Sequence, residues 1–145
     1  MTFFARRRAA LSALLVLVFI LLAACAPNPA LRYEDLFDEL DIGGRCTDVA
    51  YHVQNRQHSE RLRGQIHAIM DDLASIAPKD EQLIEINNDF IDCARLLEEA
   101  MDAYAAGDDA LAQKKYSTAE VEYNNADTAL NAYKRKLAKR RQNGS

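Results

Sequence analysis

The sequence contains little glycine and proline and no tryptophan: five glycines and three prolines occur in 145 residues. No stretch keeps the alternation of polar and apolar residues that indicates a half-buried β-strand. Alanine, leucine, glutamate, aspartate and lysine dominate most of the chain instead. Few chain-breaking residues and no strand pattern together predict an all-α protein.

The sequence also lacks the short motifs that mark a catalytic or metal site. It has no glycine-rich phosphate loop, no Gly-x-Ser-x-Gly turn and no Cys-x-x-Cys pair. The three histidines, His52, His58 and His67, are six and nine residues apart, so no two of them lie one helical turn apart. Paired carboxylates such as Asp71 and Asp72 are adjacent and point to different faces of a helix. We therefore expect no enzymatic activity, no cofactor and no metal site.

A long apolar run occurs only near the N-terminus. Arginines at positions 6–8 precede residues 11–22, where a single serine interrupts the apolar side chains. A membrane-spanning helix needs about 20 apolar residues, and a basic segment before a shorter run is typical of a secretory signal. The run ends in Leu22-Ala23-Ala24-Cys25, which resembles the lipobox of bacterial lipoproteins. An ordinary secretory signal, or an uncleaved anchor helix with a chance cysteine, is the alternative interpretation.

The lipobox resemblance implies a processed and lipid-anchored chain. In that family the signal, here residues 1–24, is removed and the cysteine, here Cys25, is acylated. Two or more acyl chains bind membranes firmly, because each buried methylene contributes about 0.8 kcal/mol. The resemblance implies membrane lipid as a partner and an extracytoplasmic domain. Ala26 stands where an aspartate would retain the protein, which implies the outer membrane if the organism has two membranes.

The remaining 121 residues are enough for one small domain. Residues 25–30 include two prolines and are expected to form a short tether, residues 31–141 a helical domain and residues 142–145 a disordered tail. A short helix is expected at 31–40, ended by Gly43-Gly44. Apolar residues then recur every three or four positions from Leu62 to Ile76, from Leu83 to Tyr104 and from Ala112 to Leu137. This spacing predicts an antiparallel bundle of three long helices plus the short N-terminal one.

Eight polar residues, Gln54–Arg61, interrupt this pattern and form a candidate exposed face. One interpretation is a solvated part of a single helix over 47–76; the other is a break, with Ser59 capping a new helix. We favour the continuous helix, because neither glycine nor proline marks a break. In that case Cys46 would lie about 22 Å from Cys93 along the bundle, too far for a disulfide. A disulfide between the two, which an oxidising compartment favours, requires the break.

Tyrosines Tyr104, Tyr116, Tyr123 and Tyr133 recur along the last two predicted helices. At this spacing they are expected in the core with hydroxyls at its edge, and Tyr104, Tyr116 and Tyr123 are candidates for a partner-binding groove. The same region, 91–124, resembles a single tetratricopeptide hairpin in its alanines, its tyrosines and Gly107-Asp108. Asp109 replaces the aromatic residue of that family's pattern, and the closing proline is missing.

Basic residues gather after Tyr133, where no acidic residue occurs. Lys134, Arg135, Lys136 and Arg140 are candidates for contact with an acidic partner or with lipid, although cations also stabilise a helix C-terminus without any partner. Three long passes would end this segment far from the anchored end, which disfavours lipid. Nucleic acid is not expected for an exported, acidic chain. The sequence favours a non-enzymatic interaction or structural module of the cell envelope with a protein partner; the alternative is a lipoprotein that binds a small ligand between its helices.

Overall fold

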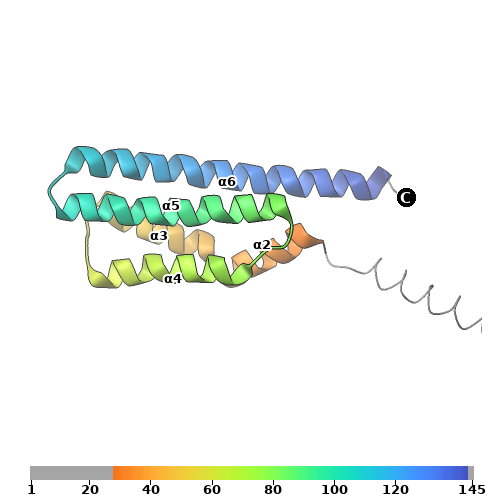
Figure 1. Cartoon of the computed structure of the whole chain (residues 1–145), viewed down its shortest axis with the longest axis horizontal. Helices are drawn as coiled ribbons and strands as arrows, with labels where there is room; N and C mark the ends of the chain where they lie inside the picture. Colours follow the sequence, from red (N-terminus) through yellow and green to blue (C-terminus); the bar gives the residue numbers. More distant parts are fainter. Residues whose placement is uncertain (1–27, 144–145) are drawn as a thin grey trace, which may run out of the picture.

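The computed structural model describes residues 28–143, and these form five helices and no strand (Figure 1). The helices are α2 (Pro29–Glu39), α3 (Ile42–Gln54), α4 (Glu60–Ile76), α5 (Glu81–Ala105) and α6 (Asp109–Asn143). The predicted all-α class is confirmed over this range. The expected signal peptide at 1–24 and the lipidation site Cys25 lie outside the described residues. None of the described helices is long and apolar enough to cross a membrane.

The five helices make four passes along the bundle (Figure 1). α2 and α3 together form the first pass, with a bend between them, and α4, α5 and α6 each form one more. Consecutive passes run in opposite directions. The number of passes is even, so α6 ends at the end of the bundle where α2 begins. An odd number of passes, such as the expected three, would have placed the two at opposite ends.

The expected continuous helix over 47–76 is wrong, because the chain breaks between α3 and α4. Arg56 takes a positive φ of 59°. The Ser59 side chain then accepts a hydrogen bond from the Leu62 amide at 3.2 Å and caps α4. Every residue from Gln54 to Arg61 is exposed, as expected. The polar run has no apolar side chain to bury, so a serine cap suffices to begin a new helix without glycine or proline.

The bend between α2 and α3 also differs in detail from the expectation. Asp41 adopts a left-handed conformation with φ 48°, and Gly43 and Gly44 lie inside the first turn of α3 instead of ending the preceding helix. A Cβ atom at Gly44 would lie 2.4 Å from the side-chain Oδ1 of Asp41, so a larger residue there would displace that carboxylate. α2 begins at Pro29, inside the expected tether, and Asn28 caps it by accepting from the Ala30 amide.

The predicted apolar seams form the core. Nearly all seam positions of α4, α5 and α6 are buried, with Ile76, Tyr104, Tyr123 and Leu137 at the margin. Asn87 is the one buried polar residue of the described range. Its side-chain oxygen accepts from the Tyr33 hydroxyl at 3.0 Å, and its amide donates to the Leu73 carbonyl at 3.1 Å. A single satisfied amide therefore joins α2, α4 and α5 inside the core.

Candidate functional site: a groove between α3 and α6

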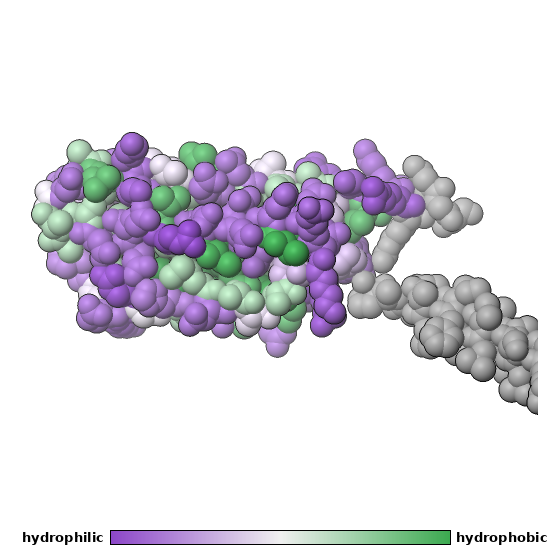
Figure 2. Space-filling view, in the orientation of Figure 1, coloured by the Kyte–Doolittle hydropathy of each residue, from purple (hydrophilic) through white to green (hydrophobic). Residues whose placement is uncertain are grey.

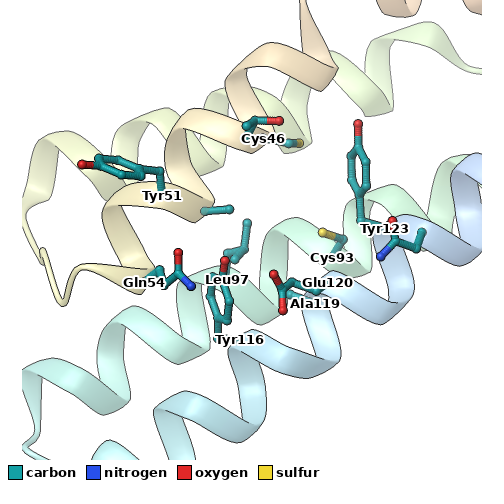
Figure 3. Close-up of a pocket in the computed structure, with 12 residues that line it drawn as sticks. Cys46, Tyr51, Gln54, Cys93, Leu97, Tyr116, Ala119, Glu120 and Tyr123 are labelled. Carbon is teal, nitrogen blue, oxygen red and sulfur yellow. The ribbon is translucent and has the colours of Figure 1, made fainter.

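A groove of about 370 Å³ lies between α3 and α6, with α5 as its floor (Figure 3). Its walls carry small and apolar side chains, and its rim carries polar ones. The lining residues are Cys46, Thr47, Ala50, Tyr51, Gln54, Cys93, Leu97, Tyr116, Ala119, Glu120, Tyr123 and Asn124. The groove is open on one side, and its volume falls within the range of small-ligand pockets. We call it the α3–α6 groove.

Side-chain size explains why the groove exists. Ala50 and Ala119 line it from the facing helices α3 and α6, and neither side chain can reach across the space. Beside Gly43 the Tyr123 side chain spans the space between the two helices, since a Cβ atom at Gly43 would lie 3.3 Å from the Tyr123 hydroxyl oxygen. The space is therefore filled by an aromatic side chain beside Gly43 and stays open where the two alanines face each other.

Two free cysteines, Cys46 of α3 and Cys93 of α5, lie on the groove (Figure 3). Both are buried, with 3% of each residue exposed. The break before α4 brings them onto one groove, which the favoured continuous helix would not allow; they are not joined by a disulfide. Burial raises the pKa of Cys46 to about 11 and that of Cys93 to about 12. Both thiols are therefore protonated at neutral pH and are poor nucleophiles.

Tyrosines shape the rim of the groove. Tyr116 and Tyr123, two of the three candidate tyrosines, line it from α6. Burial raises the pKa of both hydroxyls, and for Tyr116 the carboxylate of Glu120 on the next turn raises it further. Tyr51 of α3 is 61% exposed, and its ring turns away from the floor (Figure 3). An exposed aromatic beside an apolar floor is typical of a surface that binds another molecule.

The third candidate tyrosine, Tyr104, is not part of the groove. Its hydroxyl lies 3.5 Å from Gln113 Oε1, and the Arg56 guanidinium lies 5.7 Å from the centre of its ring. Tyr133 is buried near the start of α5, where burial and a hydrogen bond to Asp80 raise its pKa to about 12. The line of tyrosines along the sequence thus divides among three places in the fold.

The candidate basic residues also lie outside the groove, near the end of α6. Lys134 forms an ion pair with Glu34 of α2, and Lys136 donates to Gln82 of α5 at 3.4 Å. Arg135 donates to the Asn131 carbonyl of its own helix at 3.2 Å. Arg140 lines a shallow hollow that also contains Pro29. The expectation that this segment lies far from the start of the domain is wrong, because four passes return the chain to that end.

Sequence reasoning missed the α3 wall of the groove, above all Thr47, Ala50 and Tyr51. The signal for Tyr51 was present: it is a large aromatic that stands out of step with Val49 and Val53, the buried residues of α3. The groove itself depends on where the chain breaks before Ser59, which the apolar spacing alone did not determine.

Within residues 28–143 no group of three or more histidine, cysteine or acidic side chains is placed to hold a metal ion. The floor of the groove offers apolar contact and the neutral thiol of Cys93, the α3 wall offers that of Cys46, and the rim offers hydroxyl, amide and carboxylate groups. Such an arrangement suits binding by shape and hydrogen bonds. Comparison of the chain with protein-family models, with curated proteins and with solved structures finds no match.

Proposed function

We propose that this chain is a lipid-anchored protein of the bacterial cell envelope that binds a partner protein in the α3–α6 groove. Anchoring rests on the lipobox resemblance at Leu22–Cys25. The acylated Cys25 would hold the domain on the extracytoplasmic face, at the outer membrane in an organism that has two. The role is that of a tethered interaction module without catalysis.

The observation that carries the binding proposal is the open groove with an exposed aromatic at its edge. An apolar floor excludes water when a partner side chain enters it, and Tyr51 adds apolar contact area beside it. Glu120, Gln54 and Thr47 offer polar contacts at the rim, as in the margin of a protein interface.

Site-directed photocrosslinking in cells tests the groove with a closely matched pair of positions. Thr47 and Thr118 are both exposed, and each hydroxyl donates to the carbonyl four residues earlier at 2.9 Å. Only Thr47 lines the groove. We expect a photoreactive phenylalanine analogue to capture a defined protein from position 47 and not from position 118. Equal capture from both positions, or none from position 47, would reject the groove as the binding site.

Anchoring has its own test. Cells given radioactive palmitate should label the full chain, and the Cys25→Ser variant should carry no label. The crosslink from position 47 should weaken in that variant, because an unanchored chain no longer meets its partner at the membrane. An unlabelled wild-type chain would overturn the anchor and leave the crosslinking result unaffected.

A second candidate function is small-ligand binding, which the groove volume of about 370 Å³ favours. Native mass spectrometry of the purified chain separates the two possibilities. A bound species of a few hundred daltons that is lost in Ala50→Trp, where the larger side chain fills the groove, would favour the ligand. No such species together with a protein crosslink from position 47 would favour the partner.

A further inference from the structure

The start of the domain and the basic segment of α6 meet at one end of the bundle. A shallow hollow is lined both by Pro29, the first residue of α2, and by Tyr133, Lys136, Leu137 and Arg140 of α6. The ion pair between Glu34 and Lys134 joins the same two helices. In Figure 1 the start of α2 and the end of α6 lie at the same end of the molecule.

The last turns of α6 extend past the start of α5, which carries three acidic residues of the same hollow (Figure 1). Asp80, Glu81 and Glu85 line the same hollow from the start of α5. Lys136 reaches Gln82, so from Leu137 onward α6 continues beyond the first turn of α5 (Figure 1). Lys139 and Arg140 are exposed there and form no ion pair with any residue of 28–143. Figure 2 shows hydrophilic side chains over this end of α6.

The anchor would bring this end close to lipid. Cys25 precedes Asn28 by three residues, and three residues span at most about 10 Å even when fully extended. If Cys25 is acylated, the start of α2 therefore lies within about 10 Å of the membrane surface. That distance is comparable to the Debye length at physiological salt, so nearby cations interact with anionic headgroups.

We propose that the end of α6, with Arg135, Lys136, Lys139 and Arg140, docks on anionic lipid headgroups of the membrane in which Cys25 is anchored. This inference rests on the proposed lipid anchor. Each cation near such a surface contributes about 1 kcal/mol, a five-fold change in affinity. The anchor alone leaves the bundle free to tilt; a second contact at the same end holds it upright.

Upright docking matters for the groove. Cys93 on its floor lies twelve residues after Glu81, about 18 Å further along the bundle axis. The docked end therefore keeps the α3–α6 groove above the headgroups and open to a partner. The two contacts have separate roles: the acyl chains supply attachment, and the cations supply orientation.

The experiment compares two lysines on one helix. The acylated full chain is reconstituted in vesicles of neutral phosphatidylcholine, or of the same lipid with about a third of phosphatidylglycerol. Limited acetylation, read by mass spectrometry, then reports Lys139 against Lys114, an exposed lysine 25 residues earlier near the other end of α6. We expect acetylation of Lys139 to fall at least five-fold on the anionic vesicles and that of Lys114 to stay unchanged. High salt should restore Lys139, because it screens the attraction.

A charge-matched pair of variants completes the test. The double variant Arg135→Gln, Arg140→Gln should remove most of the protection of Lys139 from acetylation on anionic vesicles. The control variant Arg61→Gln, Arg95→Gln removes two exposed cations elsewhere on the bundle and should leave this protection intact. Equal acetylation of Lys139 on both vesicles, in a chain that floats with the neutral ones, would overturn the docking and keep the anchor. A chain that floats with neither vesicle would reject the anchor, and the docking with it.

Discussion

The two halves of the bundle differ in how the first pass covers the α5–α6 pair. In the half nearer the start of α2, aromatic rings fill the space: the ring centres of Phe37 and Phe90 are 4.8 Å apart, and those of Phe90 and Tyr123 are 5.5 Å apart. In the other half, α3 presents Ala50 opposite Ala119, and the α3–α6 groove remains. Similar helices thus give a closed core or an open groove according to side-chain volume.

The closed half is expected to stabilise the fold, and the groove half to bind another molecule. We expect substitutions in the closed half to cost the most stability, because the ring contacts of Phe90 and the two hydrogen bonds of the buried Asn87 lie there. The groove half can then accept substitutions that change binding with little effect on folding.

Phe90→Ala should lower the free energy of unfolding by about 3–5 kcal/mol, since it leaves a large cavity at a residue that is 1% exposed. Urea denaturation followed by circular dichroism measures the change. Ile84→Ala on the same helix is the control, because Ile84 is 41% exposed and should cost less than about 1 kcal/mol. Ala50→Leu should also cost little, because the groove has room for the added side chain. Equal losses in Phe90→Ala and Ala50→Leu would contradict the division between the halves.

Asn87→Ala should cost about 3 kcal/mol, because it leaves both the Tyr33 hydroxyl and the Leu73 carbonyl without their partner. Tyr33→Phe alone should cost about 1 kcal/mol. In the Asn87→Ala background the same change should be neutral or stabilising, since it then removes an unpaired buried hydroxyl. A double-mutant cycle measures this coupling. Strictly additive losses would show that the buried amide does not link α2 to α5.

Because the Cys46 thiol is buried in the groove, we expect the free energy of unfolding to fall at alkaline pH. Burial raises the pKa of Cys46 from 9.0 to about 11, so above pH 9 the unfolded chain releases this proton before the folded one. The unfolded state then binds fewer protons, and the free energy of unfolding falls as pH rises from 9 to 11. We expect wild type to lose about 2 kcal/mol more than Cys46→Ala over this window. Below pH 9 the difference in free energy of unfolding between wild type and Cys46→Ala should not change with pH. If the two proteins lost stability in parallel up to pH 11, the Cys46 thiol would not be buried.

Much of the helical core could be read from the sequence. The apolar spacing from Leu83 to Met101 identifies the buried face of α5, and that from Leu62 to Leu73 does the same for α4. These patterns are regular because each helix buries one face against neighbours along its whole length. The two tight connections between the last three passes also follow from local signals near Pro78 and Gly107.

The groove and the basic end could not be read in the same way. Both depend on one local event, the break before Ser59, which changes an expected three passes into four. A polar run in water is compatible with a helix or with a loop, so its sequence does not decide between them. The two alternatives place different ends of the chain together, and the packing of α3 against α4, α5 and α6 determines which one forms.

Ser59→Ala tests this break with the smallest expected effect. Loss of the cap should lower the free energy of unfolding by about 1 kcal/mol and speed hydrogen exchange at the Leu62 amide, to which the Ser59 oxygen is bonded at 3.2 Å. Ser75→Ala is the matched control, because Ser75 is an exposed serine of the same helix whose hydroxyl donates to the Asp72 carbonyl. It should change stability by less than about 0.5 kcal/mol. If Ser59→Ala instead raised both stability and helix content, a continuous helix over 47–76 would be accessible to this chain, and the shared end of α2 and α6 would no longer be fixed by the sequence around Ser59.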